Sequence, residues 1–179
     1  ADFGLKSHIA VGAWSSGGSV LAGRFNSGGA GTQTASFLAG GANSPDDAIT
    51  DETYEYNGVG WTTGGTMAGT DRLTTGSGTL TAGLIAGGNP GSSPYNAADS
   101  EEYNGTAWTE GNNLNTARRY SGHFGIQTAA VICAGETGVV AATEEYNGTS
   151  WSNGNDVNTP NSHIGGAGTL TAGLKCGGA

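Results

Sequence analysis

Four tryptophans stand at a fixed distance from a glycine, and this pattern constrains the fold more than any other feature of the sequence. Each tryptophan lies 27 residues before its glycine, and successive tryptophans are 47, 47 and 43 residues apart. The tryptophans are Trp14, Trp61, Trp108 and Trp151, and the paired glycines are Gly41, Gly88, Gly135 and Gly178. A period of this length indicates a repeat architecture, in which each repeat forms one supersecondary unit.

Three of the repeats also carry a tyrosine followed directly by Asn-Gly, five residues before the tryptophan. These tyrosines are Tyr56, Tyr103 and Tyr146, whereas the first repeat has Ile9 at that position. Asn-Gly between two short apolar segments favours a hairpin with a two-residue type I′ turn, because Asn and Gly tolerate positive φ. The pattern therefore predicts a tight hairpin in each repeat.

No segment shows a sustained helical period. Short runs of β-branched and aromatic residues separated by Gly, Asn and Ser indicate an all-β chain. In the third copy we predict four strands, at Gly122–Thr128, Ala129–Gly135, Ala142–Tyr146 and Ser150–Ser152. The loops after the paired glycines vary in length, which is typical of surface loops that carry specificity.

The two ends of the chain complement one another. The sequence begins just before a third and a fourth strand, predicted at Ser7–Val11 and Ala13–Ser16, and ends after a second strand, predicted at Ala172–Gly178. Together they would complete one four-stranded sheet and hide its edges. We therefore expect one domain over residues 1–179, a ring of four blades closed by a hybrid blade. The repeats fall at about 1–41, 42–88, 89–135 and 136–179.

These residues resemble the kelch repeat, in which an apolar run ending in Gly-Gly precedes a polar loop, a tyrosine and a tryptophan. The match is carried by LIAGG with Tyr103 and Trp108, and by VICAGE with Tyr146 and Trp151. The resemblance implies a kelch-like β-propeller, although kelch propellers usually have more blades, so the chain is either an unusually small ring or part of a larger one. The YNGTSW and AGTQTA segments are similar to repeats in structural proteins of marine phages, particularly cyanophages, and of some aquatic bacteria. That similarity implies a virion-surface or tail-associated role.

The charge of the chain excludes several classes of partner. The net charge is −9 and there are only six Lys and Arg residues, so no basic surface exists for nucleic acid. The same charge disfavours anionic membranes, and no run of 18 apolar residues could span a bilayer.

Two cysteines, Cys133 and Cys176, occupy the same repeat position. Equivalent positions in neighbouring repeats would point the same way, which is poor geometry for a disulfide. We expect both to be small buried apolar residues.

No pattern in the sequence points to catalysis. The pairs Glu101-Glu102 and Glu144-Glu145 lie on predicted strands, where neighbours face opposite sides, so we expect a solvated outer strand and not an acid–base pair. The three histidines lie at unrelated repeat positions, which favours structural or surface roles over a zinc site. They are His8, His123 and His163.

One loop is rich in carboxylates and contains Asp46, Asp47, Asp51 and Glu52. Calcium accepts such oxygen ligands, but the spacing matches no known calcium loop, so a calcium site is the minor hypothesis. We expect no metal, no cofactor and no enzymatic activity.

Three residues are the candidates for ligand contact. Tyr95 and Tyr120 do not recur in the other repeats, which separates them from the packing aromatics. Arg119 shares its repeat position with Arg72; pairing with a carboxylate is the expected role, and ligand contact is the alternative.

We therefore expect a non-enzymatic structural or interaction module on a phage virion, decorating the capsid or associated with a tail fibre. Its partners would be other virion proteins or host surface glycans, and a homo-oligomer sharing an eight-bladed ring is an alternative to a monomer. A secreted bacterial lectin or adhesin domain of kelch type is the second hypothesis. Both hypotheses place the chain on a virion surface or outside the cell.

Overall fold

The computed structural model describes residues 16–71 and 74–178, and in these residues the chain forms seventeen strands and no helix. All strands belong to five antiparallel sheets, which confirms the all-β prediction. Three sheets contain four strands in the order of the sequence, and a fourth contains two strands. We number these four sheets 1 to 4 along the chain.

The strands of each sheet are as follows. Sheet 1 contains β2 (Gly28–Thr32), β3 (Ala35–Ala39), β6 (Thr53–Tyr56) and β7 (Trp61–Thr63). Sheet 2 contains β8 (Thr75–Thr79), β9 (Ala82–Gly88), β10 (Ala97–Tyr103) and β11 (Trp108–Glu110). Sheet 3 contains β12 (Gly122–Ile126), β13 (Ala129–Cys133), β14 (Thr143–Tyr146) and β15 (Trp151–Asn153). Sheet 4 contains β16 (Ile164–Thr169) and β17 (Ala172–Gly177), and a small fifth sheet joins β1 (Arg24–Phe25), β4 (Ala42–Asn43) and β5 (Ala48–Ile49).

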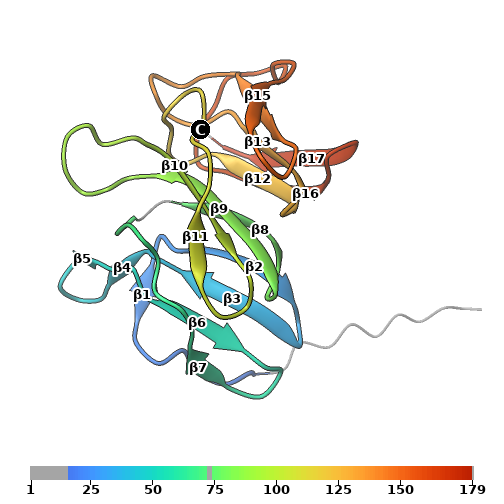
Figure 1. Cartoon of the computed structure of the whole chain (residues 1–179). Coiled ribbons are helices and arrows are strands. Elements are labelled where there is room, and N and C mark those ends of the chain that lie inside the picture. The colour runs from blue at the N-terminus through green and yellow to red at the C-terminus, as the bar shows by residue number, and fades with distance from the viewer. Residues whose placement is uncertain (1–15, 72–73, 179) are drawn as a thin grey trace, which may run out of the picture.

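The four sheets follow one another in space as they do in sequence (Figure 1). Their first strands make the contacts between sheets: β2 packs on β8, β8 on β12, and β12 on β16. The four strands predicted for the third repeat correspond to β12 through β15, with shifts of one or two residues at most ends. The repeat pattern therefore predicted both the number and the order of the strands in sheet 3.

Glycines in the first strands allow the sheets to approach closely. A Cβ atom on Gly76 of β8 would lie 3.0 Å from the backbone of Gly29 on β2, and one on Gly166 of β16 would lie 3.1 Å from the backbone nitrogen of His123 on β12. Contacts this short leave no room for a side chain. The glycine content of the inner strands is thus a packing requirement.

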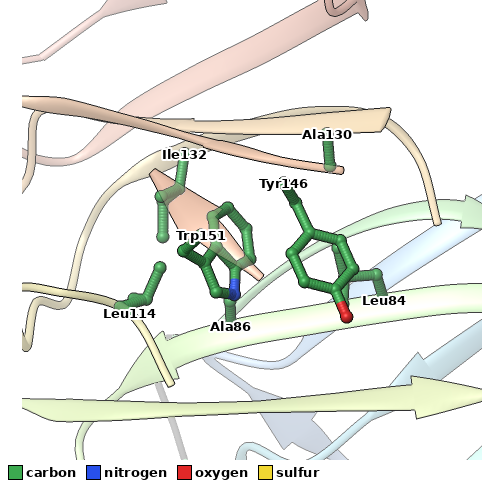
Figure 2. Close-up of a cluster of buried hydrophobic side chains, with 7 residues drawn as sticks. All are labelled: Leu84, Ala86, Leu114, Ala130, Ile132, Tyr146 and Trp151. Carbon is green, nitrogen blue, oxygen red and sulfur yellow. The ribbon is translucent and has the colours of Figure 1, made fainter. Parts of the chain in front are cut away.

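In sheets 2 and 3 the recurring tyrosine and tryptophan form the outer hairpin and pack on the preceding sheet. Tyr146 pairs with Trp151 across β14 and β15, and their rings lie 4.8 Å apart. Both side chains point from sheet 3 toward Leu84 and Ala86 on β9 of sheet 2 (Figure 2). The buried Tyr146 hydroxyl donates a 2.7 Å hydrogen bond to Glu102 of sheet 2. The recurring aromatic residues are therefore packing residues, as expected.

The same contacts recur between sheets 1 and 2. Tyr103 and Trp108 stack at 4.7 Å, and the Tyr103 hydroxyl donates to Glu55. Burial, followed by the hydrogen bond to Glu55, raises the pKa of Tyr103 to about 12, so this hydroxyl stays protonated as a donor. Trp108 Nε1 donates to Thr53 Oγ1 at 2.7 Å.

The Asn-Gly turns differ from the predicted two-residue type I′ geometry. Tyr56 pairs directly with Trp61, so the loop contains four residues, and only Gly58 has positive φ, at +91°. The Asn57 side chain accepts hydrogen bonds from the backbone nitrogens of Val59 and Gly60, each at 3.0 Å. An Asx turn of this kind satisfies the loop backbone with the asparagine side chain, so asparagine needs no positive φ.

The prediction that the paired glutamates form a solvated outer strand was wrong for one member of each pair. Glu144 is completely buried and forms a 2.8 Å ion pair with Arg118, which is also completely buried. Glu101 is 5% exposed. These carboxylates face the linker that precedes their sheet, and backbone nitrogens of the linker donate hydrogen bonds to them. The hydrogen bonds replace the water that an exposed carboxylate would bind.

The glycines paired with the tryptophans lie at the end of the second strand of each sheet or within two residues after it, and their backbone is left-handed. Their φ angles are +93° at Gly41, +136° at Gly88, +103° at Gly135 and +103° at Gly178. A Cβ on Gly135 would lie 2.3 Å from Ser121 Oγ and 2.8 Å from the carbonyl of Arg119. Both backbone angle and space therefore require glycine here.

The strands predicted at Ser7–Val11 and Ala13–Ser16 lie outside the described residues, apart from Ser16, which is in no strand. Trp14, Ile9 and His8 are among the residues outside that range. Strand β17, at Ala172–Gly177, agrees with the predicted second strand of the last repeat.

The two cysteines differ, against the prediction that both are buried. Cys133 is buried in sheet 3, whereas Cys176 is exposed on β17, and both are free thiols. Among the described residues β17 pairs only with β16, so its other side lacks the covering strand that β14 supplies to β13.

Replacing Gly135 should destabilise the fold. For Gly135→Ala we expect the free energy of unfolding to fall by about 2–4 kcal/mol, because positive φ and the clash with Ser121 add together. Chemical denaturation measures the change. Gly60→Ala is the control, since a Cβ there has nothing within 4 Å; equal stability of the two variants would contradict the assignment.

Candidate functional site

A pocket of about 550 Å³ brings the three candidate contact residues together. Tyr95 lies in the β9–β10 loop, and Arg119 and Tyr120 lie in the segment before β12. The remaining lining residues are Phe25, Asn26, Asp47 and Asn89. The β4–β5 turn, which holds Asp47, and the β9–β10 loop project on the same side of the molecule (Figure 1). The pocket thus combines aromatic rings with amide, carboxylate and guanidinium groups.

In three of the segments before the first strands, one residue has positive φ near this end of the sheets. Asn26, Tyr120 and His163 occupy the same repeat position, and their φ angles are +57°, +56° and +58°. Positive φ is costly for a residue with a side chain, above all for a bulky one such as tyrosine. Strain of this kind often accompanies functional sites.

Aromatic surface is available in the pocket. Tyr95 is 56% exposed and Phe25 is 40% exposed. The Tyr120 ring is half-buried because His163 stacks on it, with the ring centres 3.7 Å apart. The pocket therefore offers flat apolar faces that are held by neighbouring side chains.

Arg119 is fixed at the edge of the pocket. Its Nη2 atom pairs with Glu136 Oε1 at 2.9 Å, and its guanidinium lies 5.4 Å from the centre of the Tyr120 ring. The expected pairing with a carboxylate is confirmed, and the side chain keeps 22% exposure, so it can still reach a ligand. The equivalent Arg72 lies outside the described residues.

Sequence reasoning missed four of the lining residues as ligand contacts. Asn89 has no repeat signal of its own, and Asp47 was considered only for calcium. Phe25 and Asn26 could have been found, because they stand 94 residues before Arg119 and Tyr120, which is two repeat lengths. The contact role of Tyr95, Tyr120 and Arg119 stays a prediction.

The acidic loop does not gather into a metal site. Among the described residues no group of three or more His, Cys, Asp or Glu side chains is placed to hold a metal ion. Glu52 instead pairs with Arg24 at 2.5 Å, and Asp47 lines the pocket. In the described part of the chain there is also no helix that could cross a membrane.

His123 has a structural role in sheet 3. Its Nδ1 atom lies 3.1 Å from the carbonyl of Thr75, which can only accept, so Nδ1 carries the proton; Nε2 faces Ser77 Oγ at 3.4 Å. Burial lowers the pKa of His123 to about 4, because a charged imidazole would lose its hydration. His163, in contrast, is exposed.

Comparison with known proteins gave no match to any family model, and no curated protein matched the chain. The site is therefore interpreted from its own geometry.

His123 makes stability depend on pH. Its folded pKa of about 4 is below the unfolded value of 6.5, so its contribution is complete above pH 6.5 and is lost as the pH falls through 4. We expect a loss of about 3 kcal/mol across this window. His123→Asn should remove that difference in denaturation measured at pH 7 and pH 4, while the exposed control His163→Asn should keep it; equal pH dependence of both variants would overturn the assignment.

Proposed function

We propose that the chain is a non-enzymatic binding module that contacts glycans through the pocket of Tyr95, Tyr120 and Arg119. The observation that carries the proposal is this one pocket, in which exposed aromatic rings lie beside polar side chains. Sugars present C–H faces that pack on aromatic rings and hydroxyl groups that bond to amide, carboxylate and guanidinium groups. Tyr95 and Phe25 supply such faces, and Asn26 and Arg119 supply such groups.

The open shape of the pocket favours a surface ligand over a reaction. Its residues come from three loops and the edge of the small sheet, so they present a rim and not an enclosed chamber. Tyr120 and Arg119 are anchored by His163 and Glu136, which lowers the cost of ordering them on binding.

We further propose that the four sheets are blades of a kelch-like β-propeller, closed by strands from both ends of the chain. Three observations support this: the four-stranded order of sheets 1 to 3, the serial packing of β2, β8, β12 and β16, and the two-stranded sheet 4. Closure would supply sheet 4 with its third and fourth strands from residues 7–16.

The proposed location is the surface of a phage particle, in a capsid decoration or a tail fibre. Support comes from the resemblance of the YNGTSW and AGTQTA segments to phage structural proteins. A secreted bacterial lectin or adhesin would use the same pocket and the same chemistry. Finding the chain in fixed stoichiometry in purified particles would favour the first location.

Loss of the aromatic rings should weaken glycan binding. On a glycan array, Tyr95→Ala and Tyr120→Ala should each lower the affinity for any bound glycan at least about tenfold, the effect of losing roughly 1.4 kcal/mol of contact. Ile126→Ala is the control, because Ile126 is an exposed apolar residue that does not line the pocket. Absence of binding by the parent protein, or unchanged binding by both tyrosine variants, would refute the proposal.

An engineered disulfide tests the ring closure. In sheets 1 to 3 the third strand pairs with the second at equivalent positions, namely Glu55 with Phe37, Glu102 with Leu84 and Glu145 with Val131. If the ring closes as proposed, the same register would pair His8 with Leu174. In a Cys176→Ser background, His8→Cys with Leu174→Cys should form a crosslink within one chain under mild oxidation, visible on a non-reducing gel.

The matched control shifts the register by one residue, Ser7→Cys with Leu174→Cys, which places the two thiols on opposite faces of the sheet. A crosslink between two chains would indicate a ring shared by two chains instead of a ring closed within one chain. No crosslink in the first variant, or equal crosslinking in the control, would contradict closure in this register.

A further inference from the structure

One position of the repeat lies beside the buried carboxylate in sheets 2 and 3, and the residue at this position differs in charge along the chain. The residues at this position are Arg24, Asp71, Arg118 and Asn161, separated by 47, 47 and 43 residues. Each lies in the segment just before the first strand of its sheet. The repeats therefore provide an internal comparison of one position with three kinds of side chain, namely arginine, aspartate and asparagine.

In the third repeat a guanidinium fills this site. Arg118 pairs with Glu144 at 2.8 Å, and its Nη1 atom donates to the carbonyls of Ala134 and Ala142 at 3.2 and 2.8 Å. The Glu144 carboxylate also accepts hydrogen bonds from the backbone nitrogens of Asn115 and Thr116. The two carbonyls and the Glu144 carboxylate thus each accept a hydrogen bond from the Arg118 guanidinium.

The first repeat also places a guanidinium here. The side chain of Arg24 is completely buried, lies 4.2 Å from the centre of the Tyr54 ring and pairs with Glu52. Tyr54 stands at the repeat position of Glu144. Two of the four repeats therefore hold an arginine in this place.

The second repeat has an equivalent buried glutamate with equivalent backbone hydrogen bonds, but it has no arginine at this position. Glu101 is equivalent to Glu144 and accepts from the backbone nitrogens of Ala68 and Gly69, as Glu144 does from the equivalent residues. Where Arg118 would stand, the chain has Asp71. Asp71 is only 8% exposed, and its Oδ1 atom is buried without a hydrogen-bond partner among the described residues.

These groups line a cavity of about 190 Å³ that is accessible from outside. The lining residues are Ala68, Gly69, Asp71, Asp99, Glu101 and Glu110. Burial, with the charges of Asp99 and Glu101 behind it, raises the pKa of Asp71 to about 7. The cavity therefore places three carboxyl groups, those of Asp99, Glu101 and Glu110, around the Asp71 carboxyl, whose Oδ1 atom has no donor among the described residues.

We propose that this cavity binds the guanidinium group of an external ligand, in the place that Arg118 fills in the next repeat. Glu101 takes the role of Glu144, and Asp71 Oδ1 gains the donor that it lacks. Planar guanidinium forms paired hydrogen bonds with carboxylates, which a spherical ion cannot. A metal ion fits less well, because no three carboxylates among the described residues are placed to hold one.

The guanidinium has two possible sources, a small molecule or an arginine side chain of a partner protein. The cavity is separate from the glycan pocket, since the two share no lining residue. The proposal is therefore independent of the proposed function, and failure of one leaves the other standing.

The test measures binding to the full chain by isothermal titration at pH 7.5 and constant ionic strength. The probes are methylguanidine, agmatine and a short peptide with one arginine; methylammonium and calcium chloride are the comparison cations. We expect methylguanidine to bind at least tenfold more tightly than methylammonium or calcium. A peptide that binds more tightly than agmatine identifies a protein partner as the source, and the reverse identifies a small molecule.

Two variants make the site assignment falsifiable. Asp71→Asn should weaken methylguanidine binding at least tenfold, while the exposed Glu145→Gln, which does not line the cavity, should not. Asp71→Arg should rebuild the internal pair seen at Arg118, abolish binding and raise the melting temperature. Parent binding no tighter than that of the comparison cations, unchanged binding in Asp71→Asn, or a lower melting temperature in Asp71→Arg would overturn the proposal.

Discussion

Close approach of the inner strands is the constraint on which the rest of the structure depends. Backbone meets backbone where β2, β8, β12 and β16 pack in series, and Gly76 and Gly166 have no space for a Cβ. Between the outer strands of neighbouring sheets, larger side chains fill the space. The Tyr146–Trp151 pair fills that gap and bonds to the preceding sheet. Small inner and large outer residues are therefore two consequences of one geometry.

The buried carboxylate of β10 and β14 is the polar counterpart of this packing. In both sheets two backbone nitrogens of the linker bind it, which ties the linker to the sheet that follows. An ion pair completes the site around Glu144, because a buried charge is costly without a partner. The same backbone hydrogen bonds around Glu101 lie beside Asp71 instead, so an equivalent arrangement surrounds an ion pair in one repeat and an acidic cavity in the other.

The two proposed binding sites arise from departures from the repeat. Tyr95 and Tyr120 interrupt the pattern at exposed loops, and Asp71 interrupts it at a buried position. Positions that recur, such as Tyr103 and Trp108, are occupied with packing between sheets. In a repeat fold the invariant positions are needed for the scaffold, and ligand chemistry is left to the variable ones.

The sequence by itself determined the repeat length, the all-β class and the four strands of each complete sheet, since these follow from local periodicity. It also singled out Tyr95 and Tyr120, because they break the pattern. Only the tertiary structure decided that Glu144 is buried and that Phe25 and Asn26 join the tyrosines in one pocket. Those facts depend on how linkers and loops of different repeats meet, and contacts between distant segments leave no signature in local spacing.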